Sequence, residues 1–303
     1  MCRPLISPLD FMKARLIAPV VFGVVVACLV PGVSGQQSEP LRGQIKAVRV
    51  VGQVLVAHAA DKTPVAVQNN DALAQGDVIT TAKSASVVLV FSNGSTVNLG
   101  QESKLAIDEF LQDPFGAEVR VGELKEEPSR SRTKLNLTYG ELVGSVKKLR
   151  GASSFLVQTP VGAAGIRGTI FRLVYRPTGT GQAIFTLSTT AGEVIFQGTT
   201  GAPVAVGENK EVVVEVKIDD ATGAILSVEV KSQDVTPAEH QIIEQQVTQA
   251  LESLQTTVFT PETPPESPPA EQSQATPQSA PAPAPPPPAP EPPRTTPGDG
   301  QTG

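Results

Sequence analysis

Apolar and polar residues alternate at every second position through most of the chain between residues 41 and 232. The alternating segments are rich in Val, Ile and Thr, and clusters of Gly, Asn, Asp and Pro separate them. A two-residue period with these residue types favours β-strands over helices. The sequence therefore predicts one β-rich, all-β domain over residues 41–232. The expected strands are 44–51, 53–58, 73–81, 84–91, 96–99, 103–110, 133–149, 154–159, 170–175, 183–189, 193–197, 204–206, 211–218 and 224–230.

Two turn signals indicate how these strands connect. Asn93-Gly94 lies between two β-rich segments, and such a pair favours a tight hairpin in which both central residues have positive φ. Openings of the form Gly-polar-aliphatic recur at residues 43–45, 140–142 and 192–194. We therefore expect stacked hairpins or turns similar to those of a β-solenoid.

A glycine-rich segment with a single cation follows the strand-like residues 154–159. Residues 162–168 contain three glycines and Arg167, and they precede another strand-like run. Phosphate-binding loops place their glycines before a helix N-terminus, so this segment does not predict one. We interpret it as a structural corner and expect Arg167 to be buried and hydrogen-bonded to carbonyls or a carboxylate. On that interpretation, Arg167→Ala costs on the order of a few kcal/mol of stability.

Residues 112–132 interrupt the alternation with polar side chains and two prolines. We expect an exposed excursion here. Its carboxylates lack the spacing of a calcium-binding loop, so we interpret them as solvated. They include Asp113, Glu123, Glu126 and Glu127.

An amphipathic helix is predicted over residues 236–257. Thr236 is a good N-cap, Pro237 suits the first helical position, and Glu239 completes a capping box. The apolar residues of this segment lie near one face of a 3.6-residue period. They are Ile242, Ile243, Val247, Ala250, Leu251 and Leu254. Either the helix packs on the β domain or it docks a partner.

The N-terminal residues have the features of a secretory signal. A start at Met12 gives a basic segment, an apolar segment and then small residues. We therefore expect residues 1–35 to be a signal peptide and residues 36–40 a linker. Two alternatives stay open: an uncleaved membrane anchor, and lipidation at Cys28, whose preceding residues resemble the lipobox of bacterial lipoproteins.

The C-terminal residues are rich in proline. Residues 258–303 contain few apolar side chains that could compensate the cost of ordering the chain. We expect a disordered tail with polyproline II character that serves as a spacer or tether.

Charge and aromatic content narrow the choice of partner. The formal net charge of −6 is spread along the chain, aromatic residues make up 4% of it, and Trp is absent. Nucleic-acid binding requires a basic patch and often uses stacking aromatics. We therefore expect no nucleic-acid partner.

Few side chains are suited to catalysis. The chain has two histidines, His58 and His240, and both cysteines precede the expected cleavage site. A nucleophile usually needs an oriented base, and zinc sites need His or Cys ligands. We expect no enzyme activity, metal, cofactor or small-molecule substrate. A hydrolase with paired carboxylates is the remaining catalytic hypothesis, and it requires a pocket with two carboxylates, one of raised pKa.

Several motifs together resemble the FecR domain, over roughly residues 73–175 and more loosely to 197. They are Gly76-Asp77, Thr80-Thr81, Ser84, Ser86, Phe91, Asn93-Gly94-Ser95, Gly140-Glu141-Leu142 and Thr159-Pro160 followed by residues 166–171. The Thr-Pro and Arg-Gly-Thr-x-Phe signatures are the most specific part. We interpret the motif residues as structural, namely Gly76, Asp77, Asn93, Gly94, Thr159, Pro160, Arg167, Gly168, Thr169 and Phe171.

The resemblance implies a bacterial extracytoplasmic β-rich module. The best-known members of the family are inner-membrane regulators that relay outer-membrane iron–siderophore transport to a sigma factor, and a long cytoplasmic anti-sigma segment precedes their transmembrane helix. In this sequence, residues 1–15 precede the apolar leader. We therefore expect a stand-alone exported form, either periplasmic or at the cell surface or extracellular. It would be a non-catalytic binding or scaffold module of the cell envelope with a protein or glycan partner.

Membrane contact is expected only through an uncleaved leader or an acylated Cys28. The alternative function is a membrane-anchored signalling component related to the FecR-type sigma-factor regulators, without the anti-sigma segment.

Overall fold

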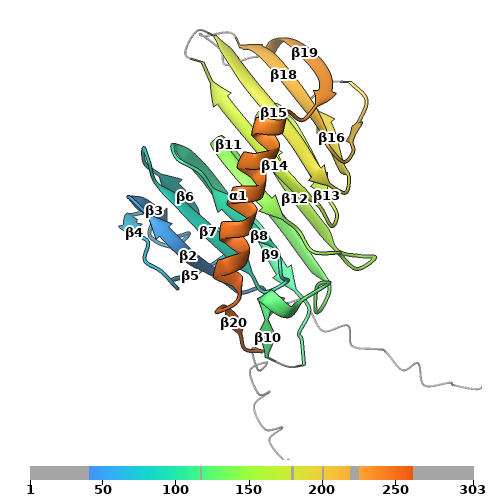
Figure 1. Ribbon diagram of the computed structural model, residues 1–303. Helices are drawn as coiled ribbons and strands as arrows, with labels where there is room; N and C mark the ends of the chain where they lie inside the picture. The colour runs from blue at the N-terminus through green and yellow to red at the C-terminus, as the bar shows by residue number, and fades with distance from the viewer. Residues whose placement is uncertain (1–40, 117, 179–180, 200, 219–224, 262–303) are drawn as a thin grey trace, which may run out of the picture. The chain divides into compact units, whose positions relative to one another are not determined.

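The computed structural model describes residues 41–116, 118–178, 181–199, 201–218 and 225–261. All of them lie in one compact unit. The predicted signal peptide and linker, Cys28 and most of the Pro-rich segment lie outside the described residues. Two sheets, called sheet A and sheet B below, form the β domain (Figure 1).

Sheet A is almost entirely antiparallel. Neighbouring strands pair in the order β4 (Pro64–Ala66), β3 (Val54–Ala57), β6 (Val78–Thr81), β9 (Ser103–Gln112), β11 (Ser131–Ser145), β12 (Ser154–Thr159), β13 (Gly162–Ile166), β16 (Val194–Gly198) and β17 (Val204–Val206). The pair β11–β12 is parallel, and β1 (Leu41–Arg42) also pairs with β9.

Sheet B is antiparallel throughout. Its strands pair in the order β5 (Ala72–Leu73), β2 (Ile45–Val51), β7 (Ser86–Phe91), β8 (Thr96–Leu99), β11, β14 (Ile170–Pro177), β15 (Gln182–Ala191), β18 (Lys210–Ile218) and β19 (Ile225–Asp234). Strand β11 belongs to both sheets: residues 131–139 pair with β9, and residues 140–145 pair with β8 and β14.

Gly140 marks the point where β11 passes from sheet A to sheet B. Its φ of +112° suits glycine, and a Cβ atom there would lie 2.1 Å from the Ser103 hydroxyl oxygen. The glycine therefore permits both the bend and the close approach of β9.

The all-β class with one C-terminal helix is confirmed. Hairpins such as β12–β13, β14–β15, β16–β17 and β18–β19 lie alternately in sheet A and sheet B. Of the two arrangements that the sequence left open, the pairing is that of stacked hairpins, because the neighbouring strands run antiparallel.

The main core lies between the two sheets. Alternate residues of the strands point into it, including Val212, Val214 and Val216 of β18, as the two-residue period predicts. Six phenylalanines fill its centre or the adjoining core beneath the helix: Phe91, Phe110, Phe155, Phe171, Phe185 and Phe259. The rings of Phe91 and Phe110 meet edge to face with centroids 5.0 Å apart.

Helix α1 (Pro237–Leu254) covers the outer face of sheet B (Figure 1). The Thr236 side chain caps it by accepting a hydrogen bond from the Glu239 amide. Ile243 and Val247 pack with Val143 of β11. The prediction that the helix packs on the β domain is therefore confirmed. Within the described residues, no helix is long and apolar enough to span a membrane.

Two local predictions were wrong. The glycines expected in a bend partly form β13, because Gly162–Ile166 pair with both β12 and β16. The excursion at residues 112–132 is only partly exposed. It contains β10 (Val119–Arg120) and a short 3-10 helix (Val121–Glu123), and β10 pairs with β20 (Val258–Phe259). The first two residues of the expected tail are therefore part of the fold.

Candidate functional site: a polar cluster beneath helix α1

A row of side chains crosses sheet B beneath α1. The strand register places Val48, Val88, Asn98, Val143, Arg172, Ser188, Glu211 and Gln233 directly beside one another on successive strands. The apolar half of the row includes Val48, Val88 and Val143, which pack in the clusters beneath the middle and C-terminal part of α1. The polar half meets the N-terminal turn of the helix, so one helix covers two chemically different surfaces.

Arg172 connects the sheet to the helix. Its Nε donates to Oε1 of Glu141 on β11 at 2.8 Å, and its Nη1 donates to Oε1 of Glu239 on α1 at 2.9 Å. The side chains of all three residues are largely buried. Gln246, two helical turns after Glu239, also donates to Glu141, at 3.4 Å. The arginine thus holds one carboxylate from each of the two elements that it joins.

Glu211 and Glu239 share a serine. The Ser188 hydroxyl oxygen lies 2.7 Å from Oε2 of Glu211 and 2.7 Å from Oε1 of Glu239. A hydroxyl has one proton to donate. Both contacts are therefore favourable only when one of the two carboxyl groups carries a proton. The other Glu211 oxygen accepts a hydrogen bond from Gln233 at 2.7 Å.

The surroundings assign that proton to Glu211. Burial raises the pKa of Glu211, and the hydrogen bond to Glu239 raises it further. Burial would also raise the pKa of Glu239, but hydrogen bonds from Glu211 and Ser188 and the charge of Arg172 outweigh it and lower that pKa. Burial opposes the charged form of Arg172, while Glu141 and Glu239 raise its pKa and keep it charged. These opposite shifts favour a proton on Glu211 and a charge on Glu239.

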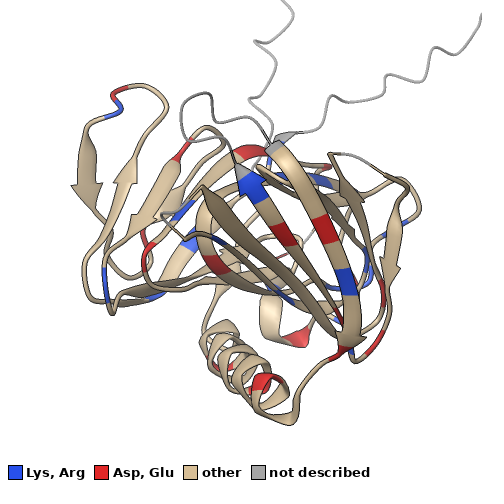
Figure 2. Cartoon of the chain, turned by 90° about the horizontal axis from the view of Figure 1, so that it is seen from above, with Lys and Arg blue, Asp and Glu red and all other residues tan. Residues whose placement is uncertain are grey.

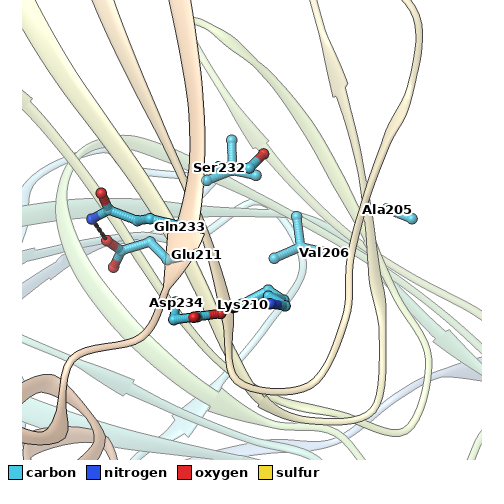
Figure 3. Close-up of a pocket in the computed structure, with 8 residues that line it drawn as sticks. Ala205, Val206, Lys210, Glu211, Ser232, Gln233 and Asp234 are labelled. Carbon is cyan, nitrogen blue, oxygen red and sulfur yellow. Dashed lines mark hydrogen bonds and ion pairs between the residues drawn. The ribbon is translucent and has the colours of Figure 1, made fainter.

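Glu211 also lines a pocket of about 420 Å³ at the edge of the two sheets (Figure 3). Asp234 lines the same pocket. Two carboxyl-bearing residues, as a hydrolase would require, are therefore among its lining residues. In Figure 3, however, the side chains of Glu211 and Gln233 extend to one side of β19, whereas Val206 and Ser232 lie on the other. Lys210 already pairs with Asp234. The carboxyl group of Glu211 is thus directed at the helix-covered face.

Gly76 and Asp77, the first predicted motif residues, form a turn before β6. Asp77 is buried; its Oδ2 accepts a hydrogen bond from the Ala74 amide at 2.9 Å, and its Oδ1 lies 3.0 Å from Nδ1 of His58. Gly76 has a φ of +93°, and a Cβ there would lie 2.7 Å from the Cβ of Ala59. Both residues make intramolecular contacts that a turn requires.

Asn93 and Gly94 form the loop of the predicted β7–β8 hairpin. The expected turn geometry was wrong, because only Gly94 has positive φ. Asn93 is fully buried: its Oδ1 accepts from the Ser95 amide, and its Nδ2 donates to the Ser131 hydroxyl at 3.0 Å. The side-chain contacts of Asn93 thus replace the backbone geometry of a two-residue turn.

The Thr-Pro and Arg-Gly-Thr-x-Phe signatures lie at opposite ends of β13. Thr159 and Pro160 turn from β12 into β13, and the Thr159 hydroxyl donates to the Gly162 carbonyl at 2.9 Å. Gly168 has a φ of +69°, and the Thr169 carbonyl accepts from the Val146 amide at 2.9 Å. Phe171 is buried against Gly144.

The expected burial of Arg167 was wrong. Arg167 is exposed to solvent, in the turn between β13 and β14. Ile166, the last residue of β13, points into the core. Successive side chains along a strand point to opposite faces, so Arg167 points away from the core. The buried cation of this region is Arg172, five residues later.

Glu127 was also predicted wrongly, as a solvated carboxylate. It is fully buried: its carboxylate accepts hydrogen bonds from the Ser131 hydroxyl at 2.7 Å, the Arg150 amide at 2.5 Å and the Ser153 hydroxyl. No periodic pattern surrounds it in the sequence.

For Arg172, the available signal was an arginine inside an apolar strand together with a helix that had to cover some face of the sheet.

Across the part of the chain that the structure describes, no three His, Cys, Asp or Glu side chains gather where they could hold a metal ion.

The fold and motifs define a β-sandwich with a helix on one sheet, and comparison with known families identifies its central part. Residues 77–194 match the family model described as FecR protein. The chain therefore contains a FecR domain, as the resemblance in the sequence indicated. A search of curated proteins gives no match.

Two solved structures have a low similarity to this chain. Both are described as a "putative anti-sigma factor from Parabacteroides distasonis ATCC 8503", at 2.50 Å and 1.65 Å resolution. The first is 12% identical over 55% of this chain and 64% of its own length, with a TM-score of 0.39. The second is 13% identical over 58% and 74%, with a TM-score of 0.38. The chain spans less than two thirds of the first structure, and likeness at this level carries no conclusion about function.

Proposed function

We propose that this chain is an exported, non-catalytic binding or scaffold module of the bacterial cell envelope, whose FecR-containing β domain recognises a protein or glycan partner. One observation carries the proposal: the titratable group best suited to acid catalysis, the carboxyl of Glu211, is covered and fully engaged. Only 3% of Glu211 is exposed.

A general acid must reach the substrate atom that it protonates. The Glu211 oxygens instead contact Ser188 and Gln233, and the partner carboxylate of Glu239 contacts Arg172. These contacts join β14, β15, β18, β19 and α1. The cluster therefore supports a structural role, in which buried charge is compensated inside the protein and holds the helix on the sheet.

The charge pattern supports a protein or glycan partner over a nucleic acid. Figure 2 shows acidic and basic residues interspersed along the described strands. Phosphate recognition needs basic residues that gather on one face.

Export is proposed from the leader sequence. The alternative, a membrane-anchored signalling component related to the FecR-type regulators, has the same β domain and differs in the fate of the leader. N-terminal sequencing of the protein from a bacterial host separates them. A chain beginning at Gln36 supports export with cleavage, whereas a membrane-bound chain that retains residues 13–30 supports the alternative.

Partner binding is tested by site-specific photo-crosslinking in the envelope. A photoreactive residue replaces Ile195, exposed on sheet A, or Ile242, exposed on α1. We expect one face to capture a discrete protein or to co-sediment with purified envelope glycan, and the other face to give none. Absence of capture and of glycan binding from both faces would remove the proposal. Hydrolysis of the glycan that is lost in Glu211→Gln would favour an enzyme instead.

A further inference from the structure

Strand β19 ends sheet B with an unusual apolar edge. Among the described strands it pairs with β18 alone. Exposed edge strands are normally short or blunted by charge, because their free backbone groups can pair with another chain. β19 is ten residues long, and it carries two exposed apolar side chains: Leu226 is 65% and Val230 48% exposed.

These side chains are exposed because sheet B extends beyond sheet A. Val230 lies opposite Val214 in the register, yet Val214 is only 1% exposed. Sheet A ends at β17, which is three residues long. The pocket of Figure 3 opens at this step, between Val206 of β17 and residues 232–234 of β19. Val228 and Val230 alternate regularly on one face of β19, and Leu226 lies at the register shift opposite Lys217 and Ile218 of β18.

The charges on this edge are complementary to those of a second copy in one register. Opposite residues of an antiparallel pair share a face, so a two-fold axis perpendicular to the sheet must pass through a residue. An axis at Glu229 or Lys231 sets like charges against each other, which is unfavourable. An axis at Val228 sets no carboxylate of the second copy opposite Lys231, which among the described residues pairs only with Glu215 and Glu229 of its own copy. An axis at Val230 sets Glu229 opposite Lys231 of the second copy, twice.

We propose that two copies of this chain associate through their β19 edges, antiparallel about Val230, so that sheet B continues from one copy into the other. The two Val230 side chains then meet, and Leu226 of one copy lies opposite Asp234 of the other, beside the pocket lined by Val206 and Ser232. The occupant of this edge is thus a second copy, and the proposal does not depend on the envelope partner proposed above.

Charge reversal tests the register. The chain without its predicted leader (residues 36–303) is examined by sedimentation velocity at low salt over micromolar concentrations. We expect a concentration-dependent dimer, weakened about tenfold or more by Lys231→Glu or Glu229→Lys alone, because each variant faces like charge in its own dimer. Mixing the two single variants should restore association as a heterodimer. Lys217→Glu, on β18, serves as the control and should leave the dimer intact, with unfolding midpoints recorded for every variant.

A cysteine provides a second measurement. Residues opposite each other in an antiparallel pair have Cα atoms about 4.5–5.5 Å apart, within the range of a disulfide. Val230→Cys should therefore form an intermolecular disulfide under mild oxidation, and Leu226→Cys should not. A wild type that stays monomeric throughout the concentration range, or a dimer that survives both single charge reversals, would overturn the proposal.

Discussion

Arg172 on β14 and Glu239 on α1 form an ion pair, with Nη1 and Oε1 separated by 2.9 Å. From its position in the sequence, the Glu239 side chain is expected to cap the helix N-terminus. Its amide does bind the Thr236 side chain, but its carboxylate reaches Arg172 and Ser188. The first turn of the helix is therefore anchored to the sheet by charge, and the later turns are anchored by apolar packing.

The apolar anchoring is tested by two adjacent isoleucines. Ile243 is fully buried and packs with Val143, whereas Ile242 is 43% exposed. Ile243→Ala should lower the free energy of unfolding by about 2–4 kcal/mol, because it removes a buried side chain and leaves a cavity. Ile242→Ala has the same propensity change and should cost below about 1 kcal/mol. Denaturant unfolding followed by circular dichroism measures both, and similar losses would show that the helix is not packed as described.

The buried carboxylate of Glu127 gives a second test. Glu127→Ala orphans the hydroxyls of Ser131 and Ser153 and the amide of Arg150, so we expect a loss of about 3 kcal/mol or more. Glu126→Ala is the matched control, because Glu126 precedes Glu127 in the sequence and its own side chain is exposed. Thermal unfolding of the two variants compares them; an unchanged midpoint for Glu127→Ala would show that this carboxylate is solvated after all.

The Glu211–Glu239 pair predicts a stability that depends on pH. The raised pKa of Glu211 stabilises the fold below its unfolded pKa, and this contribution is lost as pH rises through the folded value. The lowered pKa of Glu239 stabilises the fold above its unfolded pKa, and this contribution is lost as pH falls through the folded value. The cluster therefore stabilises the fold most at pH values between the lowered folded pKa of Glu239 and the raised folded pKa of Glu211.

Glu211→Gln isolates the upper limit of this window. The amide can still donate to Glu239 but does not ionise, so the variant should retain its stability as pH rises while the wild type loses it. Each unit of pKa difference between folded and unfolded states corresponds to about 1.4 kcal/mol. Urea midpoints measured across the pH range compare the two proteins, and parallel curves would mean that Glu211 is already ionised at low pH.

The alternation of residues predicted most of the strands because most of them have one face in the core, although β4 is exposed throughout. The residues of β18 illustrate this: Val212, Val214 and Val216 are buried as expected. The helix was equally predictable, since its cap and its apolar period are local features. The two-sheet arrangement depends on pairings between distant segments, such as β11 with β8, β9, β12 and β14, and a local pattern cannot specify these.

The polar cluster could not be predicted for the same reason. Arg172, Ser188 and Glu211 come together only through the register of three strands, β14, β15 and β18, and Glu239 joins them only when α1 crosses the sheet. The sequence points instead to Arg167, because glycines surround it. Those glycines serve the backbone of β13 and its turns, and they say nothing about the burial of the cation between them.

The two arginines provide the most direct comparison. Denaturant unfolding at neutral pH, with hydrogen exchange of the α1 amides, is measured for Arg172→Ala and Arg167→Ala. We expect Arg172→Ala to lose about 2–4 kcal/mol and to expose the first turns of α1 to exchange, since two carboxylates remain beneath the helix without their cation. Arg167→Ala should stay within about 0.5 kcal/mol of the wild type. A stable Arg172→Ala with a protected helix, or a larger loss in Arg167→Ala, would contradict an anchoring role for the cluster.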